Sequence, residues 1–178
     1  MKLTLIRHAE VEHTYLNKYN GHNDITLSNE GINQAKDISK VLDAMHFDAV
    51  YCSDLRRTKE TIKYYKLQDK VIYTKELREK SWGKHEGLSF DEIIAQNEIQ
   101  YEDFLQFINA LDGEDYQEYI KRIEVFFLEY LVSLKKEHIL IITHAGVIRV
   151  LQSIIHKKSL PEVFGKKMNY GDLIIENI

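Results

Sequence analysis

The chain has 178 residues, of which 44% are hydrophobic and 29% charged, a balance that is typical of a soluble globular domain and excludes a disordered chain. Its 24 basic and 28 acidic side chains give a net charge of −4, which offers no support for general nucleic-acid binding. The single cysteine, Cys52, excludes a disulfide within the chain and a four-cysteine zinc site, and it favours a reducing compartment.

Short apolar runs alternate with helical patterns along the chain. Strands are expected at residues 2–6, 49–52, 71–73, 138–143 and 171–177, and helices at residues 28–45, 55–66 and 147–156. Because several of these strands are apolar on both faces, the pattern predicts an α/β fold, a three-layer sandwich with a mainly parallel sheet flanked by helices. No linker is visible, so residues 1–178 are expected to form a single domain.

The segment 86–118 differs from the rest because it is rich in acidic residues and contains no lysine or arginine. Ser89 and Glu92 form a capping-box pattern that predicts the start of a helix. Apolar residues at helical spacing over residues 116–134 predict an amphipathic helix. Two interpretations of the segment stay open: a solvated helical face, or an acidic helical insertion that forms a flap over a basic site.

Two strands are expected to end in a histidine. His8 follows the first strand and lies beside Arg7, and His144 follows the strand at residues 138–143. Ligands of parallel α/β sheets bind outside the carboxyl ends of the strands, so we expect both histidines at one site. A single histidine in such a place is more often structural, but two at equivalent strand ends favour function.

Two further motifs belong to the same edge of the sheet. Residues 53–58, Ser-Asp-Leu-Arg-Arg-Thr, open a helix after the second strand and place Arg56 near the site; the alternative is a helix cap with solvated arginines. Glu79, in Leu77-Arg78-Glu79, becomes a candidate proton donor if it lies near two arginines and two histidines.

Five motifs in order resemble the histidine phosphatase superfamily. They are Arg-His-Ala-Glu at residues 7–10, Tyr-Asn-Gly-His at 19–22 with Leu-Ser-Asn-Glu-Gly at 27–31, residues 53–58, residues 77–79 continuing to Glu86-Gly87, and Thr-His-Ala-Gly-Val at 143–147. The resemblance is to branch 1, with a phosphoglycerate mutase-like fold, and more closely to small bacterial phosphatases that include α-ribazole phosphatases. It runs from residue 3 to about residue 152 and is weakest across the acidic segment.

The resemblance implies a role for each of five residues. His8 corresponds to the nucleophile, Arg7 and Arg56 to the two core arginines, His144 to the second histidine and Glu79 to the general acid. A phosphomonoester carries a charge of about −1.5 to −2 at neutral pH. Two guanidinium groups can neutralise it without a metal or other cofactor, so that neutral His8 attacks phosphorus and forms a phosphohistidine. A protonated His144 is expected to add a charged hydrogen bond to the phosphoryl oxygens.

The substrate-binding residues are expected to be Thr14, Asn20, Gly21 and Ala145. Three positions depart from the family pattern. Ala9 replaces a usual glycine, Val11 a usual serine or threonine, and Thr14 an asparagine that contacts phosphate. Thr14 retains one hydrogen-bond donor, and Asn20 is expected to compensate for the lost amide.

The expected activity is that of a phosphoric monoester hydrolase acting on a small-molecule substrate, with α-ribazole 5'-phosphate as one candidate. A phosphoglycerate mutase is the first alternative, although an acidic flap would repel phosphoglycerate and favours an ester whose remainder is neutral or hydrophobic. A non-catalytic phosphate-binding protein is the second. The arginines argue against a metal site, and the apolar neighbours of Cys52 indicate a core position rather than a thiol site.

The surroundings of the protein follow from what the chain lacks. The N-terminus has no long apolar signal sequence, and the longest uncharged stretch, residues 138–148, is too short to cross a bilayer. We therefore expect a cytoplasmic protein that binds neither membranes nor nucleic acid. Aromatic residues at 101–107 suggest a homodimer.

Overall fold

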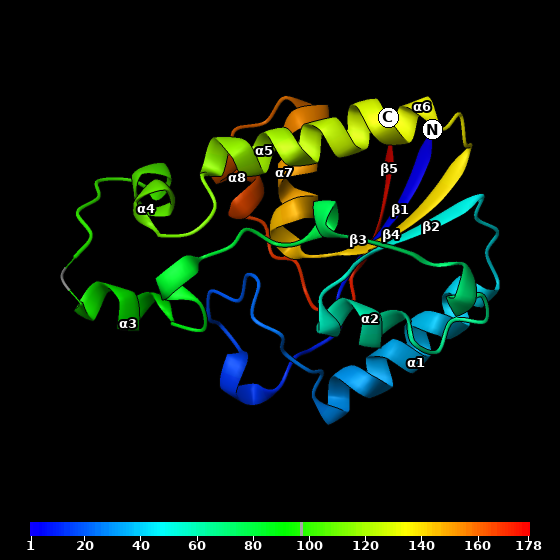
Figure 1. Ribbon diagram of the computed structural model, residues 1–178, viewed down its shortest axis with the longest axis horizontal. Helices are drawn as coiled ribbons and strands as arrows, with labels where there is room; N and C mark the ends of the chain where they lie inside the picture. The colour runs from blue at the N-terminus through cyan, green and yellow to red at the C-terminus, as the bar shows by residue number, and fades with distance from the viewer. Residues whose placement is uncertain (97) are drawn as a thin grey trace.

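A five-stranded, mainly parallel sheet forms the centre of the computed structural model, which describes residues 1–96 and 98–178 (Figure 1). The strand order is β3-β2-β4-β1-β5, and only β5 runs antiparallel to its neighbour. The strands are β1 (Lys2–Arg7), β2 (Ala49–Ser53), β3 (Ile72–Thr74), β4 (His138–Thr143) and β5 (Leu173–Asn177). The predicted fold class is confirmed, and each expected strand is present.

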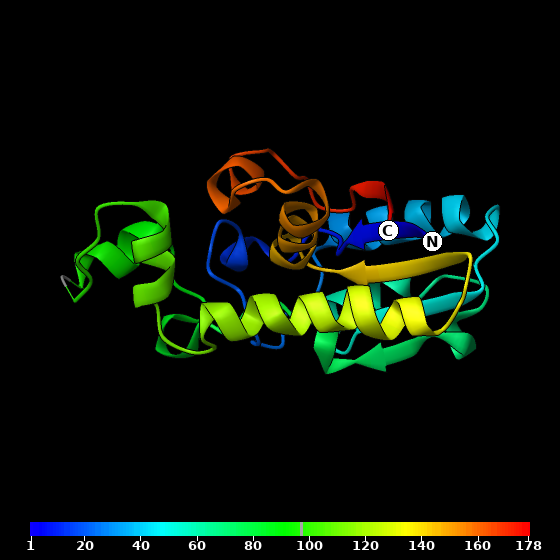
Figure 2. The ribbon, with the colours of Figure 1, turned by 90° about the horizontal axis from the view of Figure 1, so that it is seen from above.

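Helices cover both faces of this sheet. The α-helices are α1 (Asn29–Asp43), α2 (Arg56–Ile62), α3 (Phe90–Ala95), α4 (Phe104–Ala110), α5 (Tyr116–Glu124), α6 (Leu131–Ser133), α7 (Ala145–His156) and α8 (Leu160–Phe164). Single turns of 3-10 helix form η1 (His13–Tyr15), η2 (Gln68–Lys70), η3 (Lys75–Leu77) and η4 (Gly83–His85). Helices α1 and α2 lie on one face and α5 and α7 on the other, whereas α3 and α4 lie beyond the end of the sheet (Figures 1 and 2).

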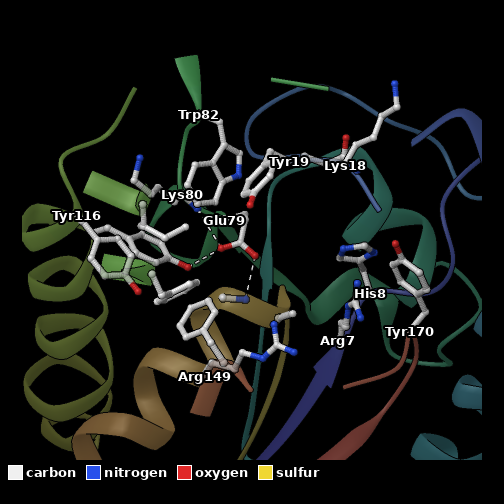
Figure 3. A pocket seen from close by; sticks show the side chains of 17 residues that line it. Arg7, His8, Lys18, Tyr19, Glu79, Lys80, Trp82, Tyr116, Arg149 and Tyr170 are labelled. Atoms are coloured by element: carbon white, nitrogen blue, oxygen red, sulfur yellow. Dashed lines mark hydrogen bonds between the residues drawn. The ribbon is translucent and has the colours of Figure 1, made fainter. Parts of the chain in front are cut away.

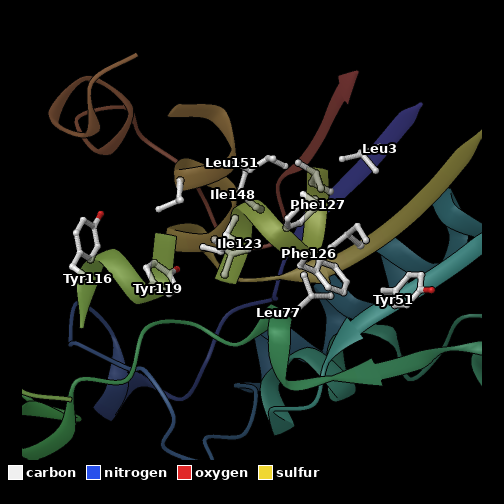
Figure 4. Packing of buried hydrophobic residues seen from close by; sticks show 14 of the residues in the cluster. Leu3, Tyr51, Leu77, Tyr116, Tyr119, Ile123, Phe126, Phe127, Ile148 and Leu151 are labelled. Atoms are coloured by element: carbon white, nitrogen blue, oxygen red, sulfur yellow. The ribbon is translucent and has the colours of Figure 1, made fainter. Parts of the chain in front are cut away.

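Alternate side chains of the strands bury themselves in opposite layers. Leu3 and Leu5 of β1 pack against α5 and α7 in the larger cluster, which Figure 4 shows with Phe127 and Leu151. Ile6 of the same strand packs against α1 and α2 in the other. Burial of apolar surface in each layer stabilises the fold by roughly 25 cal/mol per Å² removed from water. The sheet edge that carries the site is therefore held rigidly from both faces.

The predicted amphipathic helix at residues 116–134 is a continuous rod with one irregularity. It consists of α5, a π-helical stretch η5 (Val125–Tyr130) and α6. The wider π turn shifts the buried face, so that Phe126 and Leu131 are buried while Tyr130, which the regular spacing places inside, is 44% exposed. A strictly 3.6-residue pattern cannot anticipate this shift.

Three carboxylates of the acidic segment 86–118 cap its own helices. Ser89 and Glu92 form the predicted capping box of α3, and Asp103 and Asp115 cap α4 and α5. Phe107, in the aromatic group expected to pair two subunits, is 3% exposed within the monomer, so the homodimer stays a prediction. Residue 97 of the segment lies outside the described residues.

The sequence contains no uncharged stretch long enough to cross a bilayer, and the helices can be checked in the same way. None of the helices in the described ranges, 1–96 and 98–178, is both long and apolar enough to cross a bilayer.

Candidate active site

The register of two parallel strands brings the two predicted histidines together. Arg7 of β1 pairs with Thr143 of β4, so the next residue of each chain segment, His8 and His144, emerges at the same carboxyl edge. The His8 amide donates to the Thr143 carbonyl at 2.9 Å, and the two imidazole centroids lie 5.2 Å apart. The juxtaposition expected from the sequence is present.

The hydrogen bond of His8 defines its tautomer. Its Nδ1 lies 2.9 Å from the Ala9 carbonyl, which only accepts, so Nδ1 carries the proton and Nε2 keeps its lone pair. Burial lowers the pKa of His8 well below its usual value, and the positive charges of Arg57 and Arg7 lower it further. His8 is therefore neutral and suited to nucleophilic attack through Nε2.

Arg7 lies on the wall of the cavity that contains His8 (Figure 3). Its Nη1 donates to the Met168 carbonyl at 2.5 Å, and its guanidinium carbon lies 3.8 Å from the centre of the Tyr170 ring. Burial lowers its pKa, yet an arginine stays protonated at neutral pH. The fixed positive charge next to His8 suits a phosphoryl group.

The second arginine of the site is Arg57, and the prediction of Arg56 is wrong. Arg56 is exposed and pairs with Glu60 one turn along α2 at 2.7 Å, away from the histidines. Arg57 is fully buried, and its Nε donates to His144 Nδ1 at 3.2 Å. Burial lowers the pKa of Arg57 to about 10, so it remains charged.

The sequence does contain a signal that separates the two arginines. Residues 56–63 fall on two faces at helical spacing. One face is charged throughout: Arg56, Lys59, Glu60 and Lys63. On the other face Arg57 is the one charged residue among uncharged ones: Thr58, Thr61 and Ile62. The first set is a solvent stripe, and the second is buried. Arg57 is thus the one that this helix turns inward.

His144 is neutral, which corrects the expectation of a protonated imidazole. Because Arg57 Nε–H points at Nδ1, that nitrogen holds no proton, and Nε2–H donates to Ser53 Oγ at 2.9 Å. Burial and the neighbouring charge of Arg57 lower its pKa well below the usual value. His144 therefore orients Arg57 and packs against His8 instead of supplying a positive charge.

Glu79 lies in the same cavity and is held by three donors. Its Oε1 accepts from Tyr119 Oη at 2.6 Å and from the Lys80 amide at 3.1 Å, and its Oε2 accepts from the Gly146 amide at 2.9 Å. A Cβ at Gly146 would lie 2.2 Å from Oε1, so glycine is required for this approach. The carboxylate is fixed between the first turn of α7 and helix α5.

Four residues were expected to bind substrate, and they differ in position. Asn20 and Ala145 line the cavity. Gly21 lies behind its wall, where its carbonyl accepts from Arg57 Nη2 at 2.7 Å and a Cβ would lie 2.1 Å from the Lys80 carbonyl. Thr14 is exposed in η1 and does not line the cavity, because this turn points its side chain to solvent.

Glu86 is a structural contributor that sequence reasoning left without a role. Its carboxylate accepts from the backbone amides of Gly21 and His22, both at 2.8 Å, and of Trp82 at 2.9 Å. It thereby ties the loop after η1 to the loop before α3. The Glu86-Gly87 pair belongs to one of the five motifs, but the motif does not indicate the contacts that Glu86 makes with the other loop.

The remaining cavity wall contains residues that no motif indicated. Arg149 comes from the second turn of α7, Tyr170 from the loop before β5, and Lys18 and Lys80 from the two loops that Glu86 joins. Phe104 and Ile108 of α4 also contribute, so the segment 86–118 does reach the cavity. None of the acidic residues described in that segment lines it, and the expected repulsion by an acidic flap has no structural basis.

Comparison with known proteins agrees with this geometry. The chain matches the histidine phosphatase superfamily (branch 1) over residues 3–175. It is 30% identical to a probable phosphatase of Schizosaccharomyces pombe over 86% of this chain and 72% of that protein. It is 29% identical to the adenosylcobalamin/alpha-ribazole phosphatase of Escherichia coli over 85% of this chain and 77% of that protein.

A solved structure shows the same fold. The alpha-ribazole phosphatase of Shigella flexneri superposes with a TM-score of 0.83 at 26% identity, covering 100% of this chain and 91% of that one. The curated relatives also include a 2,3-bisphosphoglycerate-dependent phosphoglycerate mutase of Buchnera aphidicola, 27% identical over 88% of this chain and 84% of that protein. The resemblance expected from the five motifs is confirmed.

Proposed function

The chain belongs to the histidine phosphatase superfamily (branch 1) and is a phosphatase of that family, and on this premise we propose that it hydrolyses small phosphomonoesters without a metal, through a phosphohistidine on His8. The observation that carries the proposal is the bond from His8 Nδ1 to the Ala9 carbonyl, which leaves the Nε2 lone pair free beside two guanidinium groups.

The first step transfers the phosphoryl group. His8 Nε2 attacks phosphorus in line, a nitrogen–phosphorus bond forms, and the bond to the ester oxygen breaks. Arg7 neutralises charge on the phosphoryl oxygens, and Arg57, which is bound to His144 and whose charge acts on His8, adds a buried positive charge to the site. Glu79, in its protonated form, gives its proton to the departing alkoxide.

The second step restores the enzyme. Glu79, now a carboxylate, takes a proton from a water molecule that attacks the phosphohistidine. The nitrogen–phosphorus bond breaks, inorganic phosphate leaves, and His8 returns neutral with its Nδ1 proton unmoved. Because one carboxyl group serves both steps, its three donors matter: they keep it in place while its charge changes.

For the physiological substrate, α-ribazole 5'-phosphate is our candidate, supported by the named activity of relatives about 29% identical. The phosphoglycerate mutase alternative gains support from one finding: Lys18 and Arg149 line the cavity and acidic residues of segment 86–118 do not, so a second anionic group would not be repelled. The experiment therefore includes both substrates.

The purified protein should hydrolyse p-nitrophenyl phosphate and α-ribazole 5'-phosphate at full rate in EDTA. His8→Ala should lose at least about a thousandfold in kcat, while the control His46→Ala, a change at an exposed histidine, should keep it. Loss of activity in EDTA or survival of turnover in His8→Ala contradicts the proposed mechanism. Interconversion of phosphoglycerates faster than their hydrolysis would favour the mutase.

A further inference from the structure

The cavity continues past Glu79 into a part with apolar walls. Its side chains come from loops and helices outside the sheet, and we name it the aromatic chamber: Tyr19, Trp82, Phe104, Ile108, Tyr116 and Phe164. The rings contact one another in pairs, with centroids 5.1 Å apart for Tyr19 and Trp82 and 5.3 Å apart for Phe104 and Phe164. Trp82 and Tyr116 are nearly fully buried, so the chamber is already formed without a ligand.

The position of Glu79 relates the chamber to the chemistry. In the view of Figure 3 its carboxylate lies between His8 and Tyr170 on one side and Tyr116 and Trp82 on the other. A phosphorus atom placed against His8, with its ester oxygen near Glu79, directs the alcohol portion of the substrate toward the aromatic chamber. The chamber thus contacts the part of the substrate that the arginines do not.

The chemistry of the walls favours a ring. The whole cavity has a volume of about 240 Å³, and an apolar cavity of about 150 Å³ is enough for benzene. Aromatic side chains bind aromatic ligands edge-to-face or offset, whereas these ring faces do not replace the hydrogen bonds that a polyhydroxylated alcohol loses to water. One buried hydroxyl, Tyr116 Oη, has no hydrogen-bond partner and can meet a single polar atom of the ring.

Resting on the phosphatase function above, we propose that the alcohol portion of the substrate carries an aromatic ring that binds in the aromatic chamber, so that the enzyme selects aromatic phosphomonoesters over small aliphatic and polyhydroxylated ones.

Two alkyl phosphates with leaving groups of similar basicity test this selectivity. In EDTA, kcat/KM for 2-phenylethyl phosphate should exceed that for ethyl phosphate by about tenfold or more, because burial of the phenyl ring is worth at least that factor. Phe104→Ala and Phe164→Ala should each reduce this ratio several-fold. The matched control, Tyr64→Ala, removes an exposed aromatic ring from the far side of the sheet and should leave the ratio unchanged.

The outcomes separate the two proposals. If neither phosphate is hydrolysed, the phosphatase mechanism fails. If both are hydrolysed with equal kcat/KM, the aromatic chamber does not bind the alcohol, and only this inference is overturned. The same holds if both phenylalanine variants keep the ratio of the parent protein. Phe104→Leu and Phe164→Leu, which keep apolar volume but lose the ring, should lower the ratio less than the alanine changes and guard against loss of folding.

Discussion

Arg57 is the residue whose role can be tested most directly, because its neighbour in the chain provides the control. Arg57→Met removes the charge beside His8 together with the bonds to His144 and to the loop carbonyls of Asn20 and Gly21. Loss of a buried positive charge next to the reacting group should cost about a hundredfold or more in kcat. Steady-state kinetics should show this loss, whereas Arg56→Met should stay within about twofold of the parent.

A folding defect and a catalytic defect can be separated in the Arg57 variants. Arg57→Lys retains a positive charge and should recover part of the rate lost in Arg57→Met, while thermal unfolding shows whether either protein is folded. Equal activity of Arg57→Met and Arg56→Met would contradict the assignment of the second arginine.

The residues near His8 show how far sequence reasoning reaches at this scale. Arg7, His8 and Glu79 follow motifs that the chain carries in order, so their meeting could be predicted. The charge of His144 could not, because it depends on which atom of Arg57 faces which ring nitrogen. Arg149 and Tyr170 belong to no motif, and only folding brings them to the cavity wall.

At the scale of elements, the loop between η1 and α1 is held from two directions. From within the core, Arg57 donates hydrogen bonds to the Asn20 and Gly21 carbonyl oxygens of this loop. From the other side, the Glu86 carboxylate accepts from the amides of Gly21 and His22. Since Asn20 and Tyr19 of this loop line the cavity, its position affects substrate binding more than the chemical step.

Glu86→Gln tests the contribution of that loop. The glutamine side chain has one acceptor oxygen in place of two, and its NH₂ group would face backbone N–H groups that now donate to Glu86. Because these N–H groups lose their partner, the loop should loosen. KM for p-nitrophenyl phosphate should rise about tenfold with a smaller change in kcat. Glu98→Gln removes an exposed carboxylate that pairs with Lys84 nearby and should change neither constant; a fall in kcat alone in Glu86→Gln would contradict a positioning role.

The elements themselves were largely predictable, and the exceptions have local causes. The strands carry continuous apolar runs. The helix expected from residue 28 begins at Asn29, where the Ser28 hydroxyl caps it by accepting from the Gly31 amide at 2.9 Å. The π turn η5 escapes a search for regular spacing. For segment 86–118 two interpretations stayed open, a solvated helical face or a flap over the site, because composition alone does not show where its carboxylates point. In the structure Glu92, Asp103 and Asp115 cap helices, and none of the acidic residues described in the segment lines the cavity.

At the scale of the whole molecule, the site places two buried neutral imidazoles, His8 and His144, beside Arg7 and Arg57. Both have pKa values well below the usual value, chiefly because of burial. In the unfolded chain the same groups titrate near pH 6.5, so below that pH the unfolded state binds protons that the folded state does not. Folding stability should therefore fall as the pH drops through about 6.5.

Urea unfolding at pH 7.5, 6.5 and 5.5 measures this loss. Each of the two groups contributes up to about 1.4 kcal/mol per pH unit below pH 6.5, until its folded-state pKa is reached. Carboxylates with lowered pKa values, such as Asp54, act in the same direction only near pH 4 and below, so the loss between pH 6.5 and 5.5 reports histidines. His22, His85 and His138, whose pKa values burial also lowers, add to it, so the difference between the parent and His8→Gln isolates the site. His8→Gln should make the unfolding free energy depend less steeply on pH, whereas His46→Ala should not. An unfolding free energy that stays constant from pH 7.5 to 5.5 would show that the imidazoles are not held neutral. The chemistry proposed for His8 would then lose the free Nε2 lone pair on which it depends.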